Sequence, residues 1–243
     1  MMRDNGTTGT LYGVGVGPGD PELMTLQAVR LIKAHEVMAL PVRHEAHDRA
    51  ELQQSAAYRI AVQAVPELAE KTLLPLLLPM SKDPEVLTAS RRRAAEEIAG
   101  CLDAGKSVIF LTLGDPTIYS TFGYLERIVK ELGYRTRYVS GVTSFCAAAA
   151  AAGVPLAERD EALHILPGMY LSCDMPYGDG TRVLMKSGGR LAEIKAGYGQ
   201  DGALLFAVEN CGMPGEHIYF GADEIPDESG YFTVVIAKGG NRQ

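Results

Sequence analysis

The sequence predicts an α/β protein with two domains, the first built on a largely parallel sheet and the second on a mixed sheet. Short β-branched or leucine-rich runs alternate with longer helical segments as far as Val139, a pattern typical of parallel α/β structure. Beyond Ser140 the runs shorten, helices become fewer and glycine turns separate the strands. We therefore expect an N-terminal α/β domain over residues 10–139 and a C-terminal α/β domain over residues 140–243.

In the first domain, hydrophobic runs and helical periodicity alternate regularly. We expect strands at Leu11–Val16, Val37–Leu40, Thr72–Leu78, Ser107–Leu113 and Arg135–Val139, and helices at Pro21–His35, Ala50–Val65, Val86–Leu102 and Ser120–Leu132. The first helix is predicted to have Asp20 as its N-cap and Pro21 in its first turn, where a missing N–H costs nothing. The last is predicted to end at Gly133, because glycine readily takes the left-handed conformation of a helix end.

In the second domain, a helix rich in small residues is expected first and short strands follow. The helix is predicted at Thr143–Ala152, and the strands at Leu163–Leu166, Arg182–Met185, Leu204–Val208, His217–Phe220 and Tyr231–Ala237. Turns are predicted at GDG, SGG, GYGQDG and CGMPG. The stretch 169–180, MYLSCDMPYGDG, fits none of these elements and could shape access of a substrate.

Composition narrows the class of protein. With 243 residues, 47% apolar and 22% charged, the chain is globular rather than disordered or disulfide-dense. A net charge of −7 argues against a nucleic-acid surface. The four cysteines form no C-x-x-C motif, no signal peptide is recognisable, and no apolar stretch is long enough to span a bilayer. We expect a soluble cytoplasmic protein with reduced thiols.

Three motifs resemble known sites but lack the required context. Residues 100–107 match G-x-x-x-x-G-K-S, yet the predicted helix precedes this motif and the strand follows it, the reverse of a phosphate-binding loop. We therefore interpret Gly105 as a helix-ending residue. His44 and His47 lack the H-E-x-x-H spacing, and we expect no metal site. The loop 13–19 breaks the dinucleotide fingerprint at its third glycine, which disfavours a nicotinamide dehydrogenase.

Three loops that follow predicted strands carry the functional signal. The first, GVGVGPGDP, has four alternating glycines from Gly13 to Gly19, which permit close approach of the backbone to a ligand. The second, LGDPTIYST, begins at Leu113, and the third, SGVTSF, begins at Ser140. Because open α/β sheets bind ligands at the carboxyl ends of their strands, the first two loops predict a single cleft. The third could cap the following helix or bind a ligand.

The ordered motifs GVGPGDPELMTLQA, TLGDPTIYSTFGYL and VSGVTSFCAAAAAAGVPLAERD resemble those of the tetrapyrrole methylases of cobalamin and sirohaem synthesis. The later segments VLMKSG, FAVENCG and YFTVVIAKG extend the resemblance over most of residues 10–238. The second and third motifs are most similar to those of precorrin-2 or cobalt-factor-II C20-methyltransferases. The resemblance implies two α/β domains of the tetrapyrrole methylase type, a homodimer, and S-adenosylmethionine in a cleft between the domains. It leaves open whether the substrate already contains cobalt.

The resemblance also implies roles for individual residues. Those expected at the cofactor are Pro18, Gly114, Asp115, Ile118, Thr143, Ser144, Lys186 and Phe206. Gly114, Asp115 and Ile118 are expected to hold the cofactor through backbone and carboxylate contacts, and Lys186 through its backbone. Gly17, Tyr119 and Arg43 are candidates for contact with the tetrapyrrole, whose carboxylates suit an arginine. Tyr119, Glu209 and Asp115 are candidates for the base, and the sequence does not rank them.

The predicted activity is methylation of C20 of a small tetrapyrrole, with S-adenosylhomocysteine as the product. A methyl sulfonium reacts by in-line displacement, so the protein must chiefly align the reactants and exclude water. Three alternatives stay open: methylation at another position of the tetrapyrrole, methylation of a macromolecule, and a module that binds S-adenosylmethionine without turnover. The acidic charge disfavours the macromolecule.

Overall fold

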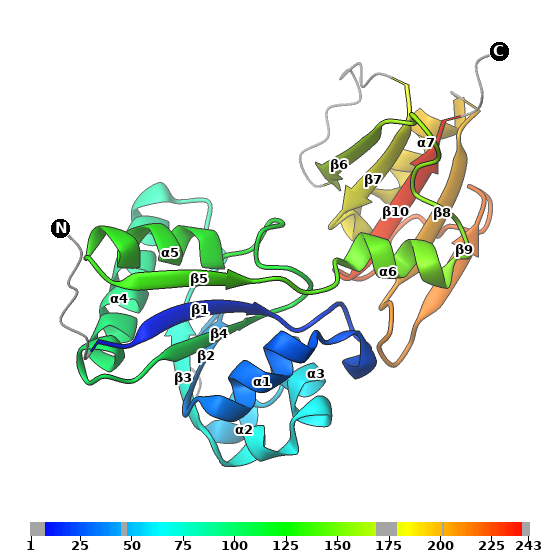
Figure 1. Ribbon diagram of the computed structural model, residues 1–243. Helices are drawn as coiled ribbons and strands as arrows, with labels where there is room; N and C mark the ends of the chain where they lie inside the picture. Colours follow the sequence, from blue (N-terminus) through cyan, green and yellow to red (C-terminus); the bar gives the residue numbers. More distant parts are fainter. Residues whose placement is uncertain (1–7, 45–47, 169–178, 201, 240–243) are drawn as a thin grey trace. The chain divides into compact units, whose positions relative to one another are not determined.

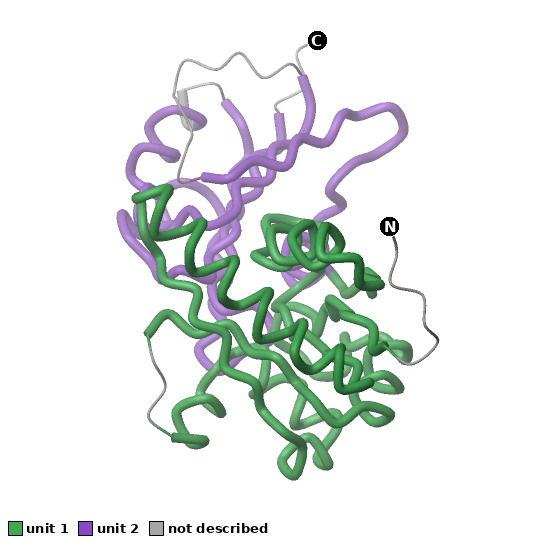
Figure 2. The backbone as a smooth tube through the Cα atoms, turned by 90° about the vertical axis from the view of Figure 1, so that its left-hand side faces the viewer, with its two compact units in different colours: residues 1–142 green, residues 143–243 purple. Residues whose placement is uncertain are grey.

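A computed structural model describes residues 8–44, 48–168, 179–200 and 202–239 of the chain. The chain forms two compact units, residues 1–142 and 143–243, which we call unit 1 and unit 2 (Figure 2). The division falls three residues after the boundary expected from the sequence. Most of the segment 169–180, whose role the sequence left open, lies outside the described residues.

Unit 1 is a parallel five-stranded sheet with helices on both faces (Figure 1). Its strands are β1 (Thr10–Gly15), β2 (Val37–Val42), β3 (Thr72–Leu77), β4 (Val108–Thr112) and β5 (Arg135–Val139), in the order β3-β2-β4-β1-β5. The helices are α1 (Leu26–Ala34), α2 (Arg49–Leu52), α3 (Ala56–Ala64), α4 (Pro84–Asp103) and α5 (Phe122–Glu131). Two 3-10 helices, Pro21–Leu23 and Pro66–Glu70, complete the unit.

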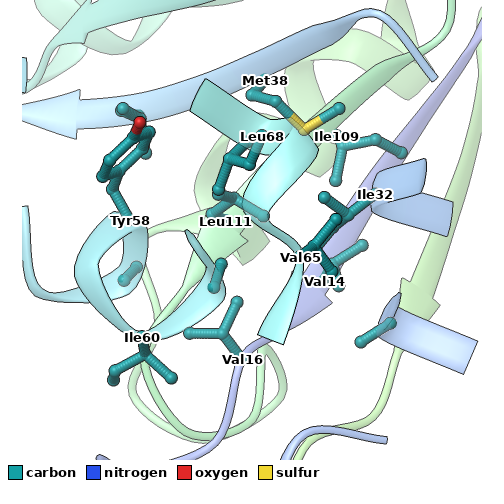
Figure 3. Packing of buried hydrophobic residues seen from close by; sticks show 14 of the residues in the cluster. Val14, Val16, Ile32, Met38, Tyr58, Ile60, Val65, Leu68, Ile109 and Leu111 are labelled. Carbon is teal, nitrogen blue, oxygen red and sulfur yellow. The ribbon is translucent and has the colours of Figure 1, made fainter. Parts of the chain in front are cut away.

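Side chains along each central strand point alternately to the two faces of the sheet, so the core of unit 1 has two parts. Ile109 and Leu111 of β4 point to the face covered by α1 and α3, where they meet Ile32 and Leu68 (Figure 3). Val108 and Phe110 point to the opposite face, covered by α4 and α5. A sheet buried on both faces requires continuous apolar strands, which explains the run VIFLTL that predicted this element.

Two helices expected to be continuous are interrupted. The prediction of one helix over Pro21–His35 is wrong, because Asp20 caps only a 3-10 turn. The α-helix begins at Leu26 instead, and the Thr25 side chain accepts the hydrogen bond of its N-cap. The predicted helix at Ala50–Val65 is likewise divided into α2 and α3 around Ser55.

The helix-ending role predicted for Gly105 is confirmed. Gly105 has φ +75°, and the amides of Gly105 and Lys106 donate to carbonyls in the last turn of α4. This is the hydrogen-bonding pattern of a glycine-terminated helix. The phosphate-loop pattern at residues 100–107 therefore lies at a helix C-terminus. Gly133 ends α5 in the same way, with φ +95°.

Unit 2 is a mixed five-stranded sheet, as the sequence predicts. The strands are β6 (Leu163–Pro167), β7 (Thr181–Met185), β8 (Leu204–Glu209), β9 (His217–Phe220) and β10 (Thr233–Lys238), in the order β6-β7-β10-β8-β9. Only β6 and β7 pair in parallel. Helix α6 (Ser144–Ala151) contacts β10 and β8.

A second helix of unit 2, α7 (Leu191–Gln200), was not expected from the sequence. Leu191 and Ile194 pack on one face of the sheet against Leu205 and Ala207. The helix continues through two glycines of the segment GYGQDG, which the sequence analysis assigned to a turn. Burial of the two apolar side chains offsets the cost of glycine in a helix, about 1 kcal/mol per residue.

Candidate functional site at the strand ends

Three loops meet at the carboxyl edge of the sheet in unit 1. The order β4-β1-β5 places the ends of these strands side by side, so the segments that follow them share one edge. Two of the loops pair directly: the Gly114 amide donates to the Gly17 carbonyl at 2.8 Å, and the Gly17 amide donates to the Gly114 carbonyl at 3.4 Å. The expected proximity of the first two loops is confirmed.

Glycine allows the loop backbones to touch where they cross. A Cβ on Gly15 would lie 2.4 Å from the carbonyl oxygen of Gly114 and 2.7 Å from the amide nitrogen of Gly141. A Cβ on Gly141 would lie 2.2 Å from the same carbonyl oxygen. A Cβ on Gly13, by contrast, would meet the Phe122 ring at 2.4 Å. Two of the four alternating glycines thus serve packing inside unit 1.

Asp115 joins two of these loops through its carboxylate. Its Oδ2 accepts a hydrogen bond from the Gly141 amide at 3.0 Å, and its Oδ1 accepts two from Thr117, from the amide at 2.8 Å and from the hydroxyl at 2.5 Å. Asp115 is 8% exposed. A buried carboxylate must be hydrogen-bonded, and here the protein itself supplies three donors.

Thr25 ties the start of α1 to the same edge. Its hydroxyl donates to the carbonyl of Ser140 at 3.3 Å and accepts the N-cap hydrogen bond from the amide of Ala28 at 3.2 Å. Thr25 was not among the predicted site residues, because Asp20 was expected to be the N-cap of this helix. An alternative N-cap signal was present, since Thr25 directly precedes the apolar residues of α1.

The other site residues predicted in unit 1 also follow strands at this edge. Pro18 is buried in the first loop, and the Ile118 amide donates to the Asp115 carbonyl at 3.3 Å. Tyr119 is 44% exposed and has φ +46°, a strained conformation for a side chain of this size. Arg43 is exposed after β2, the neighbour of β4.

Thr143 has a buried hydroxyl without a hydrogen-bond partner. Among the buried side-chain oxygen and nitrogen atoms that the structure describes, Oγ1 of Thr143 is the one without a hydrogen-bond partner. Thr143 occupies the N-cap of α6, but its side chain does not cap the helix. Ser144 is the first residue of that helix. An unsatisfied hydroxyl costs about 1–3 kcal/mol, and a ligand that bonds it recovers part of that cost.

One edge of the unit 2 sheet gathers the remaining candidates. Antiparallel pairing of β10 with β7 and β8 places Thr233 opposite Glu209 and Val234 opposite Met185. Lys186 follows β7 and has φ +60°. Its Nζ lies 5.8 Å from the ring centroid of Tyr231. Asn210, which follows β8, has φ +50°. Left-handed conformations at non-glycine residues cluster at functional sites.

Glu209 and Phe206 have partners within unit 2. A Glu209 oxygen accepts from the Gly230 amide at 2.9 Å, and the other accepts from the Tyr219 hydroxyl at 3.4 Å. Hydrogen bonds from Ser229 and Gly230 lower the pKa of Glu209 below its ordinary value. Phe206 lies within β8, and its ring packs edge-on against Phe220 at 5.9 Å.

The structure therefore divides the predicted residues into two groups. The edge of unit 1 holds Gly17, Pro18, Arg43, Gly114, Asp115, Ile118 and Tyr119. In unit 2, Thr143 occupies the N-cap of α6 and Ser144 is its first residue, while Lys186 and Glu209 lie at one sheet edge and Phe206 lies within β8. Gly15, Thr25 and Thr117 belong to the loop assembly of unit 1 and were not among the predicted site residues.

The described residues lack two further features. They contain no group of three or more His, Cys, Asp or Glu side chains that could hold a metal ion. Nor does any helix in them have the length and apolar character needed to cross a membrane.

Known proteins with similar sequences cover nearly the whole chain. A probable cobalt-precorrin-2 C(20)-methyltransferase of Methanocaldococcus jannaschii is 34% identical, over 94% of this chain and 95% of its own length. A precorrin-2 C(20)-methyltransferase of a Sinorhizobium species is 30% identical, over 95% of this chain and 96% of its own length.

Known structures show the same two-part fold. The uroporphyrin-III C-methyltransferase of Thermus thermophilus, crystallised with S-adenosylhomocysteine, superposes with a TM-score of 0.65 at 22% identity, covering 95% of this chain and 97% of its own. The family model of the tetrapyrrole (corrin/porphyrin) methylases matches residues 10–224. The two similar sequences, the fold and this match lead to one conclusion: the chain belongs to the tetrapyrrole methylases.

Proposed function

We propose that the protein transfers a methyl group from S-adenosylmethionine to C20 of precorrin-2 or its cobalt complex in cobalamin biosynthesis. The observation that carries this proposal is the similarity to C(20)-methyltransferases over nearly the full length of both chains. Those two relatives differ in their named substrate, one with cobalt and one without, so the metal content of the substrate is left to experiment.

The residues present fit S-adenosylmethionine. Thr143 offers a buried hydroxyl without a partner, and the glycine loops bring backbone to the sheet edge without side chains in the way. We propose that Pro18, Gly114, Ile118, Thr143 and Ser144 contact the cofactor, together with Asp115, Lys186 and Phe206. Asp115 contributes through its backbone, because its carboxylate already accepts three hydrogen bonds.

S-adenosylmethionine supplies a methyl group on a sulfonium, so the protein needs no activated nucleophile of its own. The reduced tetrapyrrole is electron-rich at C20, and the remaining tasks are to align it, exclude water and accept one proton. The hydrogen-bonded loop assembly suits alignment. For contact with the tetrapyrrole we propose Gly17, Tyr119 and Arg43, the last as a partner for a peripheral carboxylate.

The environments of Glu209 and Tyr119 support different roles for these two candidate bases. Because hydrogen bonds favour the ionised form of Glu209 and lower its pKa, its carboxylate is a weak base near neutral pH. Tyr119 is exposed and held in a left-handed conformation beside the Asp115 loop. We therefore propose Tyr119 as the group nearer the reaction. Tyr119→Phe should lower kcat more than it raises KM if the hydroxyl takes part in the chemistry.

The decisive experiment incubates the purified protein anaerobically with methyl-labelled S-adenosylmethionine and either precorrin-2 or cobalt-precorrin-2. Label at C20, located by NMR of the product, supports the proposal and identifies the substrate. Label at another carbon supports methylation at a different position. Tight cofactor binding without label in either tetrapyrrole would support a binding module instead.

We also propose that the enzyme acts as a homodimer in the cytoplasm, as its family resemblance implies. Light scattering coupled to size-exclusion chromatography measures the mass in solution. A mass near twice the monomer value of 26.1 kDa supports the dimer, and the monomer value refutes it.

A further inference from the structure

The carboxylate of Asp115 spans two loops that do not follow neighbouring strands. Asp115 follows β4 and Gly141 follows β5, and β1 lies between these strands in the sheet. The hydrogen bond from the Gly141 amide to Asp115 Oδ2, at 3.0 Å, therefore connects the loops on either side of β1. We call this bond, together with the two from Thr117, the Asp115 clasp.

The loop after β1 is held within this arrangement. Gly15, the last residue of β1, lies against both flanking loops, because a Cβ there would approach Gly114 and Gly141 within 2.7 Å. Two hydrogen bonds between Gly17 and Gly114 fix the next turn of the same loop. Moving Gly141 away would therefore remove the support on one side of the β1 loop.

The capacity of the carboxylate is largely used within the protein. A carboxylate offers about four acceptor positions, and three protein donors already bond to Asp115. The residue is 8% exposed, which leaves little surface for a ligand. Both facts favour a role in holding the loops over direct contact.

We propose that Asp115 is a positioning residue that sets the geometry of the cofactor loops through the clasp, without contact between its carboxylate and the cofactor. This inference rests on the proposed use of S-adenosylmethionine. It makes a specific prediction about charge. A carboxylate in contact with the sulfonium would favour the cationic cofactor over S-adenosylhomocysteine, which lacks that charge, whereas a positioning residue affects both ligands equally.

Calorimetric titration of Asp115→Asn with each ligand tests the proposal. Asparagine offers one acceptor oxygen in place of two and cannot serve both Gly141 and Thr117. We expect Kd to rise about 10- to 100-fold for both ligands, the range set by hydrogen bonds to a charged group. Thr117→Val should raise both Kd values less, and the double variant should not exceed Asp115→Asn, because both changes break the same clasp.

Glu126→Gln provides a matched control. Glu126 is also 8% exposed in unit 1 and also accepts from a threonine hydroxyl, that of Thr136 at 2.7 Å, but it lies within α5 and outside the loop edge. This variant should lower Tm and leave both Kd values within about twofold of wild type, since its partners lie outside the shared network. If Glu126→Gln raised Kd as much as Asp115→Asn does, the weaker binding would be due to lost stability, and the proposal would be overturned.

Hydrogen exchange provides a readout that does not depend on ligand. In the free protein, the Gly141 amide should exchange faster in Asp115→Asn than in wild type or Glu126→Gln. If the Gly141 amide of Asp115→Asn exchanges as in wild type, the clasp is overturned. If this variant has a higher Kd for S-adenosylmethionine alone, the positioning role is overturned. If wild type binds neither ligand, the proposed function fails, while the exchange measurement still tests the clasp. Thr117→Val serves in place of Asp115→Asn if the latter does not fold.

Discussion

Unit 1 and unit 2 are both five-stranded sheets with helices, but the segments that follow their strands are arranged in different ways. In unit 1 every strand runs in the same direction, so β4, β1 and β5 deliver three loops to one edge, where glycines and the Asp115 clasp join them. In unit 2 the strand directions mix, so that β6, β7 and β8 end at the edge where β9 and β10 begin. Shared hydrogen bonds join the loops of unit 1, where Tyr119 is left-handed, whereas left-handed residues follow single strands of unit 2 at Lys186 and Asn210.

The two units also differ in charge. Residues 1–142 contain 16 Lys and Arg against 17 Asp and Glu, whereas residues 143–243 contain 7 against 13. The net charge of −7 is therefore concentrated in unit 2. A substrate that carries several carboxylates would meet less repulsion at the loops of unit 1, where we place its contact with Arg43.

The largest effect should follow from a change where the loops cross. Gly15→Ala introduces a Cβ 2.4 Å from a neighbouring carbonyl oxygen, so the loops must separate. We expect a loss of stability of about 1–3 kcal/mol from overpacking. We also expect a loss of about 100-fold in kcat, because a displacement of about 1 Å disturbs alignment. Denaturant unfolding and methyl-transfer rates measure the two effects.

Gly100→Ala is the control for this substitution. Gly100 lies in α4, and beyond its chain neighbours and its own helix backbone no atom lies within 4 Å of the Cβ it would gain. Alanine there should raise helix stability by about 0.5–1 kcal/mol without effect on catalysis. Equal rates for Gly15→Ala and wild type would show that the crossing does not set the geometry of the site.

The sequence predicted the parallel sheet, the mixed sheet and the loop edge, because apolar runs and glycine turns depend on local spacing. It could not predict the bond between Asp115 and Gly141, since that bond depends on the order of the strands. The start of α1 was misplaced because Asp20 and Pro21 form a valid cap, which the chain uses for a 3-10 turn. Helix α7 was not predicted, because its glycines indicated a turn. Burial of Leu191 and Ile194 in the core stabilises the helix nonetheless.

The second-largest effect should follow from a substitution of Thr143, the first residue of unit 2. Thr143→Val replaces a buried hydroxyl without a partner by a methyl group of similar size. The free protein should become about 1 kcal/mol more stable, while cofactor binding should weaken about tenfold, because the ligand loses a hydrogen bond. Thermal unfolding without ligand and calorimetric titration measure these opposite changes. Thr143→Ser keeps the hydroxyl and should bind as wild type does. Destabilisation by valine would contradict the expectation.

Relief of the left-handed backbone in unit 2 should have a smaller effect. Lys186→Gly and Arg159→Gly both remove a side chain from a residue with positive φ, 60° and 51° respectively. Each should stabilise the protein by about 1 kcal/mol or less, since glycine avoids the strain but adds entropy to the unfolded chain. Only Lys186→Gly should also weaken cofactor binding. If both variants bind equally well, the strain after β7 has no role in the site.

The smallest effect should be a dependence of stability on pH. Hydrogen bonds lower the pKa of Glu209 from its ordinary value of 4.5, so its ionised form stabilises the folded state above that pH. This contribution is lost as the pH falls through the lowered pKa. The difference in Tm between wild type and Glu209→Gln should therefore be largest near neutral pH and shrink below about 4.5. A constant difference down to pH 3 would show that the carboxylate charge is not involved.

The bond between Asp115 and Gly141 also bears on how the chain is made. Gly17, Gly114 and Gly141 are far apart in the sequence, and Gly141 is the penultimate residue of unit 1. During synthesis the first two loops can pair before the third has left the ribosome, but the assembly closes only after nearly the whole unit has emerged. Formation of such long-range contacts is slow. Competence to bind the cofactor should therefore be acquired as one of the last events in the folding of unit 1.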